Sequence, residues 1–516
     1  FLQRSDRGSH TRFKVRVHTS FIFRMLTEVL VSSSFLITIL IFLKVRKDEK
    51  KGKETRKRRM SFTSANMAMG CMPEKAKLSD PIINILITFE NPPKEDDLIP
   101  LVETLFEYDR LSQVPKGRPG FTDWRLESVG DIDPKRMIRS VNVVCETKEE
   151  WAEVIQQQHV ERSSIRKEDL PWWEFLLLIN DRDNDHVLLC RFDHSITDGL
   201  SIGKVFTRIM KRMDGSEIST LVPKSMVSNK TKSDEKRLEM LLKLPKAILD
   251  VSTSPLGKYD DGTHFSKNLV GKDVVDRGLL DLLIFDPVPI DFIKEMKNKA
   301  GVSLNDILLT VWSHAILDFC EHHECPVIKN MGERLQCRAL MTYGFPNISL
   351  DKAEAVKNGW VPLSLNLNVG IRDILKKLKC INTQTTKLKN SPLARVQLYL
   401  QNAILPYVPV ALNRKTVYGV YSRHSMNCTN VPGPQERVCI AHQPVKSCMF
   451  FVPFIHPVLS MLSYNGQIHI TFTANKSAIQ NVELLPKFYM KALLTLGNKL
   501  DVDIPPAIAK LVNGGE

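Results

Sequence analysis

A histidine, an aspartate and a glycine at fixed spacing are the residues of this sequence best suited to acid–base chemistry. His194, Asp198 and Gly199 fall within the run Arg-Phe-Asp-His-Ser-Ile-Thr-Asp-Gly, directly after an apolar run of strand length. A histidine where a strand ends can take the proton of a hydroxyl at neutral pH. Asp198 would hold the loop through an ion pair or backbone hydrogen bonds, and the glycine lets the chain turn into a helix. The same spacing also fits a plain turn in which Asp198 only caps the helix that follows.

The segments around this motif predict an α/β fold, because strand-like and helix-like patterns alternate in both halves of the chain. Asn465-Gly466 predicts a tight hairpin, and Ser303 is expected to cap a helix. Expected strands are 81–89, 175–179, 186–192, 279–285, 361–368, 449–452, 458–464 and 467–473. Expected helices are 97–111, 151–159, one directly after Gly199, 289–300 and 304–320.

The basic charge of the chain is concentrated at its amino-terminal end. The 516 residues carry a net charge of +14, but residues 1–62 alone hold 16 Lys and Arg against 5 Asp and Glu. The remaining residues hold 56 against 53, so the body is nearly neutral. A nucleic-acid-binding domain needs a basic body, and this distribution excludes that class. Ten cysteines without a CxxC pair favour a reducing, cytosolic environment for the body.

An apolar run near the start predicts a single membrane anchor. Residues 25–43 contain one charged side chain, Glu28, and ten Lys and Arg follow between 44 and 59. The length suffices to cross a bilayer, and the basic flank is expected on the cytosolic side. A signal peptide is the alternative, although no small-residue cleavage site follows the run.

The expected organisation has six parts. Residues 1–24 form a leader, whose presence in the mature protein depends on whether Met25 is the true start. Residues 25–44 are the transmembrane anchor and 45–74 a basic juxtamembrane linker. The body comprises an N-terminal half at 75–213, a crossover linker at 214–278 and a C-terminal half at 279–512. Within the crossover, 238–251 is apolar and is expected to pack on the body or to lie on the membrane surface.

Several segments in the same order resemble one family. The 193–199 block resembles the HHxxxDG motif of the bifunctional wax ester synthase/diacylglycerol acyltransferase family, within the CoA-dependent acyltransferase superfamily. Four more segments are similar to the family's PLW, ND, SNVPGP and SYxG motifs, namely 170–175, 301–307, 429–434 and 462–469. The resemblance covers about 80–475. One departure is plain, because Asp193 stands where the motif has its first histidine.

The resemblance implies an acyltransferase with a two-domain, mixed-sheet fold. It implies transfer of a long-chain acyl group from acyl-CoA to a fatty alcohol or diacylglycerol, without a metal or a further cofactor. His194 would be the general base and Asp198 would orient the loop. Gly199, Asn305 and Asn430 would line or position the substrates, although Asn305 also fits a helix cap and Asn430 a strand-ending turn. Such substrates partition into membranes, so we expect an address on the endoplasmic reticulum.

Two other functions stay open at this stage. The chain is either a silent, membrane-anchored lipid-binding relative or an acyltransferase for a small polar acceptor. Asp193 either raises the pKa of the imidazole or points away along the strand. We expect His314 and His456 to be core residues, no nucleophile at Cys190 or Cys428, and no zinc site in the 320–325 cysteine–histidine cluster.

Overall fold

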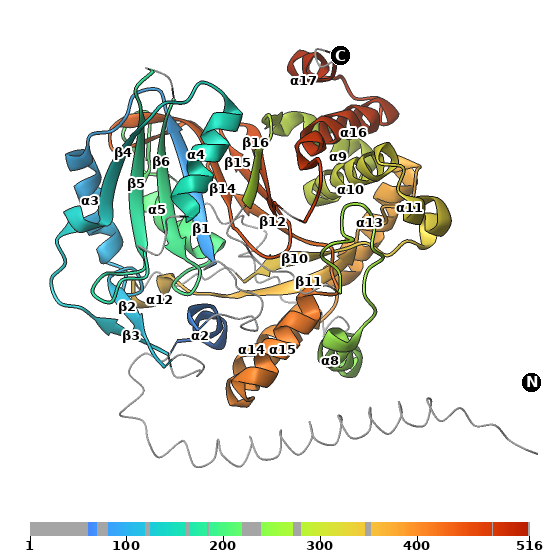
Figure 1. Ribbon diagram of the computed structural model, residues 1–516, viewed down its shortest axis with the longest axis horizontal. Helices are drawn as coiled ribbons and strands as arrows, with labels where there is room; N and C mark the ends of the chain where they lie inside the picture. The colour runs from blue at the N-terminus through green and yellow to red at the C-terminus, as the bar shows by residue number, and fades with distance from the viewer. Residues whose placement is uncertain are drawn as a thin grey trace, which may run out of the picture. The chain divides into compact units, whose positions relative to one another are not determined.

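The computed structural model describes residues 60–69, 81–118, 124–160, 165–182, 185–218, 239–271, 280–345, 352–476 and 478–513. The predicted leader and anchor lie outside these residues, as does most of the predicted linker. Element labels follow Figure 1. The described chain forms two large sheets with helices packed against them and a small two-stranded sheet, so the mixed α/β fold expected from the sequence is confirmed.

The first sheet carries the chain into the histidine motif. Its central strand β1 pairs antiparallel with β6 on one side and β14 on the other. Helices α3 (Glu95–Phe106) and α5 (Gly199–Ile209) share a core with one face, and α4 (Lys148–Val160) packs on the other. In spatial order the strands are β4 (Ile138–Val143), β5 (Trp173–Asn180), β6 (His186–Asp193), β1 (Ile82–Phe89), β14 (Gln443–Phe451), β13 (Val438–Ile440) and β7 (Lys211–Arg212).

The second sheet is covered by the largest core of the molecule. Trp312 on α10 lies at 0% exposure within it. The strands, in spatial order, are β11 (Trp360–Asn366), β10 (Arg338–Gly344), β12 (Met426–Pro432), β15 (Val458–Tyr464), β16 (Gln467–Asn475) and β8 (Leu280–Ile284), with β9 (Val288–Pro289) also on β16. The helices of this core are α9 (Ile290–Ala300), α10 (Leu304–His322), α13 (Ile374–Lys389) and α16 (Leu485–Lys499).

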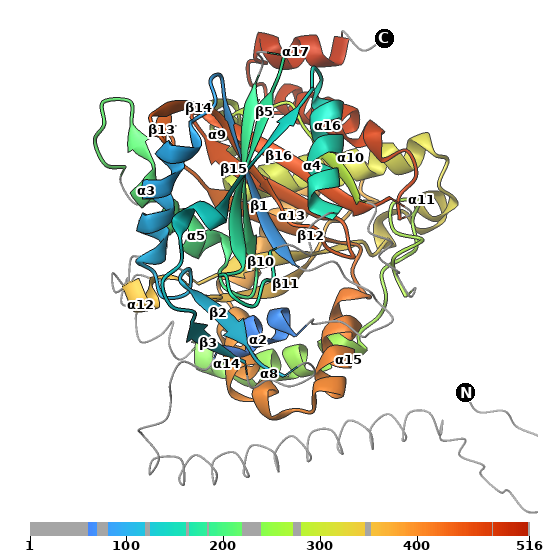
Figure 2. The same ribbon diagram turned by 60° about the vertical axis from the view of Figure 1, so that its left-hand side comes forward.

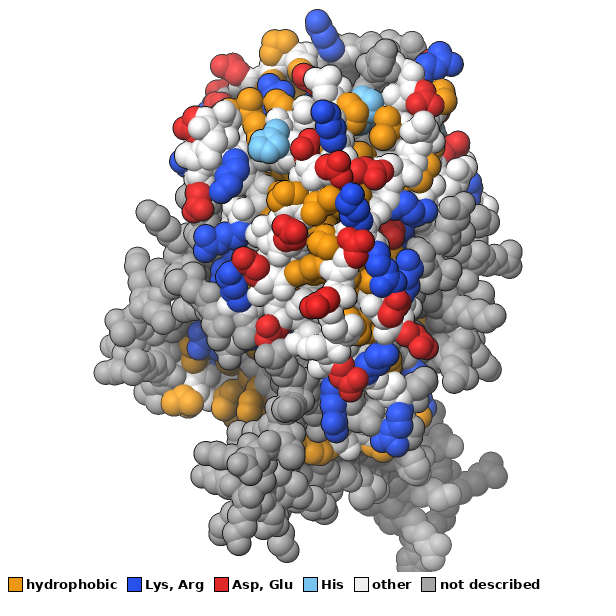
Figure 3. Space-filling model, turned by 90° about the vertical axis from the view of Figure 1, so that its left-hand side faces the viewer, with side chains coloured by type: hydrophobic (Ala, Val, Ile, Leu, Met, Phe, Trp, Pro, Cys, Tyr) orange, Lys and Arg blue, Asp and Glu red, His pale blue; other side chains and the backbone are white. Residues whose placement is uncertain are grey.

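Four helices gather at one end of the body in both ribbon views (Figures 1 and 2). They are α2 (Phe62–Ala68), α8 (Leu244–Thr253), α14 (Leu393–Ala403) and α15 (Val410–Tyr421). The smaller elements are α11 (Pro326–Met331), α12 (Lys352–Ala355), α17 (Pro506–Asn513), β2 (Gln113–Lys116) and β3 (Arg125–Ser128), with short 3-10 turns between them. On the side that carries α3, acidic and basic side chains are interspersed (Figure 3).

Local predictions hold where the sequence signal is strong. Asn465 and Gly466 have φ of 46° and 71° and join β15 to β16 as a tight hairpin. Ser303 caps α10 in a reciprocal capping box with Asp306.

The chain order of the strands does not match their order in the first sheet. Strands β13 and β14 come from the later part of the chain but belong to the first sheet. There β14 completes the pairing of β1, a strand buried along its whole length.

Within the described residues, no single helix combines the length and the apolar composition of a membrane span. Helices α9 and α10 have the required length and apolar composition only when they are counted together, and a bend of 99° separates them.

Candidate active site

His194 lies directly beyond the last residue of β6. Asp193 still pairs with Ile82, and the backbone N–H of His194 donates to the Pro81 carbonyl at 2.7 Å. The strand therefore fixes the backbone position of His194. Its side chain is half-buried, in contrast to the four buried residues that follow it before α5.

Asp198 connects the start of α5 to a segment of the second sheet. One carboxylate oxygen accepts the N–H of Ser201 at 2.8 Å, as a helix cap does. The other accepts the N–H of Gly359 at 2.7 Å, and the Ser201 hydroxyl donates to the Lys357 carbonyl at 2.9 Å. Asp198 is thus more than the plain cap that the spacing allowed. It makes no contact with the imidazole and fixes residues 357–359 against the histidine loop.

Arg110 places a positive charge near this carboxylate. Burial lowers the pKa of Arg110 to about 10, while the charge of Asp198 acts to raise it. At neutral pH the guanidinium remains protonated. It donates to the Ile196 carbonyl at 3.4 Å and to the Ser64 hydroxyl at 3.0 Å, so it ties the histidine loop to α2.

The side chain of Asn358 lies within hydrogen-bonding distance of the His194 ring. Its Oδ1 lies 3.2 Å from Nδ1 of the imidazole, and its amide nitrogen donates to the carbonyls of His194 and Ser195 and to the Ser64 hydroxyl. The ring of Trp360 lies on another side, 5.6 Å between centroids. Sequence reasoning missed Asn358, because a lone asparagine before a strand carries no distinctive signal.

Asp193, the departure from the family motif, points away from the imidazole. Its carboxylate has 0% exposure and accepts from Nε of Arg166 at 2.7 Å and from the N–H of Ser195 at 2.9 Å. Arg166 also lies over the ring of Trp172, 4.8 Å from its centroid, and donates to the Met67 carbonyl. Of the two possibilities that the sequence left open, the structure shows the second. The PLW-like segment positions the arginine that neutralises Asp193.

Helix α2 is attached to the histidine loop at both ends. Ser64 accepts from Arg110 and Asn358, and the carbonyls of Met67 and Ala68 accept from Arg166 at 3.3 and 3.2 Å. Every residue of the helix is buried. The sequence had placed this segment in a linker, because its small and polar residues show no amphipathic spacing.

Asn305 and Asn430 come together, as a shared role would require. Nδ2 of Asn430 donates to Oδ1 of Asn305 at 2.6 Å. Among the described residues, none of the hydrogen bonds of His194, Asp198 or Asn358 reaches this pair. The strand of Asn430 touches the motif elsewhere, because a Cβ on Gly199 would lie 3.2 Å from Val431. Close packing, and not a left-handed backbone, therefore explains this glycine.

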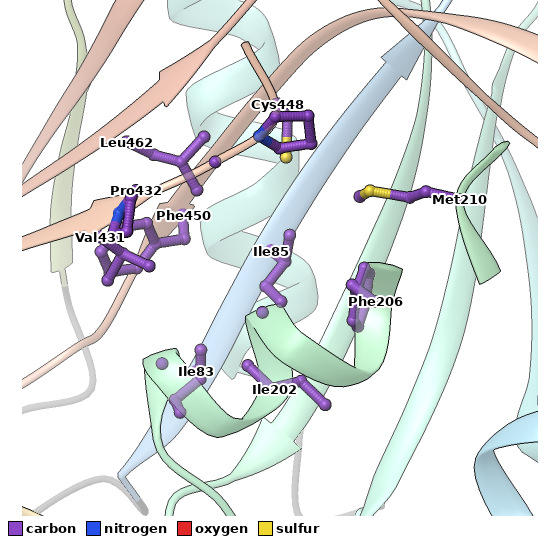
Figure 4. A pocket seen from close by; sticks show the side chains of 14 residues that line it. Ile83, Ile85, Ile202, Phe206, Met210, Val431, Pro432, Cys448, Phe450 and Leu462 are labelled. Carbon is purple, nitrogen blue, oxygen red and sulfur yellow. The ribbon is translucent and has the colours of Figure 1, made fainter. Parts of the chain in front are cut away.

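An apolar pocket begins at Gly199 and continues along α5 between the two sheets (Figure 4). Its wall is almost free of polar atoms, and His194 is not part of it. The lining residues are Ile83, Ile85, Gly199, Ile202, Gly203, Phe206, Met210, Val431, Pro432, Gly433, Pro434, Cys448, Phe450 and Leu462.

Of the other histidines and cysteines considered from the sequence, His456, Cys190 and Cys428 are buried and His314 is half-buried. Burial lowers the pKa of His456 to about 3 and of His314 to about 4, so both are neutral at pH 7. Burial raises the pKa of Cys428 to about 12 and that of Cys190 as well. Neither thiol is ionised at neutral pH. In the described part of the chain, no cluster of three or more His, Cys, Asp or Glu could hold a metal ion.

Solved acyltransferases share this two-sheet fold. A wax ester synthase/diacylglycerol acyltransferase from Marinobacter aquaeolei VT8 matches 86% of this chain and 100% of its own, with a TM-score of 0.54 and 13% identity. A trichothecene 15-O-acetyltransferase from Fusarium sporotrichioides matches 86% and 94%, with a TM-score of 0.55 and 12% identity. The likeness to these two structures concerns the fold, a mixed α/β architecture with two large sheets.

Sequence comparisons find similarity to one family. The family model of the WS/DGAT C-terminal domain matches residues 358–496. Wax ester synthase/diacylglycerol acyltransferase 6 of Arabidopsis thaliana is 22% identical over 370 residues, 63% of this chain and 71% of the relative. Wax ester synthase/diacylglycerol acyltransferase 8 of the same plant is 23% identical over 362 residues, which are 60% of this chain and 71% of the relative. Residues 358–496 match the WS/DGAT C-terminal domain, and the chain resembles the wax ester synthase/diacylglycerol acyltransferase family over most of its length. These similarities indicate an acyltransferase enzyme.

The pairing of Asp193 with Arg166 can be tested by removing the arginine. Arg166→Met leaves a carboxylate of 0% exposure without its cation. We expect the free energy of unfolding in urea to fall by about 3–5 kcal/mol, as for other broken buried pairs. The matched control is Arg136→Met, whose partner Asp169 is 62% exposed; it should cost no more than about 1 kcal/mol. Equal stability of the two variants would contradict the role of Arg166.

Proposed function

We propose that this acyltransferase moves a long-chain acyl group from acyl-CoA to the hydroxyl of a fatty alcohol or of diacylglycerol. The supporting observation is a half-buried imidazole that sits where the two sheets meet. One of its nitrogens faces Asn358, and an apolar pocket begins five residues further along the chain. The plant and bacterial relatives are named as wax ester synthases and diacylglycerol acyltransferases.

His194 acts as the general base. Its free nitrogen takes the proton of the acceptor hydroxyl while the hydroxyl oxygen attacks the thioester carbonyl. The tetrahedral intermediate then collapses, the carbon–sulfur bond breaks, and the departing CoA thiolate takes the proton back from the ring. Neither a metal nor a covalent enzyme intermediate enters this sequence. Binding the acyl-CoA and the acceptor next to the imidazole accounts for much of the rate enhancement. The three reacting groups then no longer have to meet by diffusion.

The apolar pocket is suited to an alkyl chain of one of the two substrates. Ile83 and Ile85 of β1 and Ile202 and Phe206 of α5 form part of its wall (Figure 4). Each methylene that leaves water for such a wall contributes about 0.8 kcal/mol to binding. Asn305 and Asn430 hold each other's amides in a fixed orientation, and their remaining N–H groups can donate to a substrate oxygen.

The test of this function is the reaction catalysed by His194→Ala. Radiolabelled palmitoyl-CoA is supplied with hexadecanol, with diacylglycerol or with a small polar alcohol, and the labelled esters are separated. The native chain should form wax ester or triacylglycerol, and the variant should be slower by about 10²–10⁴-fold because the proton has no acceptor. His322→Ala, on an exposed position of α10, should keep the native rate.

Three outcomes would overturn the proposal. Ester formation only with the polar alcohol would identify a different acceptor class. No ester with any acceptor, together with tight binding of lipid, would identify a silent binding relative. An unchanged rate in His194→Ala would remove the histidine from the chemistry.

A membrane location accompanies this function as part of the proposal. Residues 25–44 would anchor the chain in the endoplasmic reticulum with the body on the cytosolic side. Nine of the thirteen large hydrophobic side chains exposed in the described residues lie at 241–259 and 399–412, on or beside α8, α14 and α15. Residues 393–421, which include α14 and α15, hold Arg395, Arg414 and Lys415 and no Asp or Glu. An apolar and cationic surface of this kind fits an anionic lipid surface.

The proposed contact can be measured with a fluorescent probe on the full chain. A polarity-sensitive label at Leu249→Cys, on exposed α8, should shift to the blue and be quenched by spin-labelled lipid in vesicles containing phosphatidylserine. The matched control is Val144→Cys, equally exposed but at the end of β4, which should show neither effect. The unsubstituted chain, labelled in parallel, gives the background of the native cysteines. Equal quenching at both sites, or shielding of Leu249→Cys without quenching by lipid, would refute the membrane contact.

A further inference from the structure

The side-chain amide of Asn358 has an unambiguous orientation. It is 5% exposed and has four polar neighbours, of which three are oxygens. The carbonyls of His194 and Ser195 and the hydroxyl of Ser64 surround one end, and the imidazole Nδ1 faces the other. Carbonyl oxygens only accept hydrogen bonds, so the NH₂ group must face the oxygens. The amide oxygen then faces the ring.

An amide oxygen cannot donate a hydrogen bond, so the Nδ1 atom of His194 must be the donor in this contact. In a neutral imidazole only one nitrogen carries hydrogen, and the other keeps its lone pair. We infer that Asn358 is a positioning residue that holds His194 in the Nδ1–H tautomer and so leaves Nε2 free to take the proton of the substrate. This inference rests on the proposed role of His194 as the base.

The residues that fix Asn358 lie between the two large sheets. Its neighbours Lys357 and Gly359 are bonded to Ser201 and Asp198 at the start of α5, which follows β6 of the first sheet, and β11 of the second sheet begins at Trp360. A shift of the first sheet relative to the second would therefore move the Asn358 amide away from the imidazole ring. Asp198, the second residue of the HxxxDG motif, acts on the imidazole through this segment and not by direct contact.

The charges around the histidine loop are paired. Asp193 is bonded to Arg166, and Asp198 lies near the buried Arg110. The groups that touch the ring, Asn358 and Trp360, are both neutral. A carboxylate introduced at position 358 would therefore be a new charge directly at Nδ1.

Two substitutions of similar size separate the positioning role from packing. Asn358→Asp keeps an oxygen that accepts from Nδ1 but adds a negative charge, which favours the protonated ring. The acid limb of the kcat/KM profile should move to higher pH by about one unit or more, and the rate should recover above it. Asn358→Leu has no acceptor, so kcat should fall by roughly a hundredfold or more at every pH, with the KM for acyl-CoA little changed. Thermal unfolding of both variants reports whether they fold.

Equal losses in the two variants at all pH values would overturn the inference, since packing alone would explain them. A native profile whose acid limb is unaffected by His194→Ala would instead overturn the proposed function. If neither variant folds, the native chain still decides the matter. With ¹⁵N-labelled histidine, the resonance missing from His194→Ala identifies the ring among the 13 histidines. A protonated Nδ1 supports the inference and a protonated Nε2 refutes it.

Discussion

The contact between the Asp198 carboxylate and the backbone of Gly359 is the interaction on which the site depends. It ties the loop that carries His194 to the segment that carries Asn358, so that the imidazole and the amide lie within hydrogen-bonding distance. The Asp198 carboxylate also caps α5. A single side chain thus fixes both the start of this helix and the segment 357–359 before β11. This explains why the motif needs an aspartate four residues after the histidine although the two side chains do not touch.

Local sequence patterns predicted the strands and helices next to the motif. They could not predict which strands pair when the partners lie far apart in the sequence. Strands β1, β5, β6, β15 and β16 follow from apolar runs and one Asn-Gly turn, and α5 from its amphipathic spacing. The assignment of β14 to the first sheet could not be predicted, because pairing with β1 joins residues about 360 positions apart. The cationic helices α13, α14 and α15 were not expected either, since their apolar faces are narrow and partly exposed.

The site divides in the same way. His194 and Asp198 were predictable because their spacing and strand-end position carry a chemical meaning. The partners that make them work were not, because Asn358, Arg110 and Ser64 reach the loop only through tertiary contacts. Asp193 was visible as a departure from the family motif, but its neutralisation by Arg166 depends on geometry that the sequence order hides. An aspartate that is ion-paired with Arg166 thus stands at the position of the first histidine of the motif.

The central claim is that Asp198 and Asn358 act on the imidazole as one unit. A double-mutant cycle on kcat measures this directly, using Asp198→Ala, Asn358→Leu and the chain that carries both. If Asp198 works by holding Asn358 in place, the double variant should be within about threefold of the slower single variant, because coupled residues do not add. If the two losses multiply, the residues act independently and the account is contradicted.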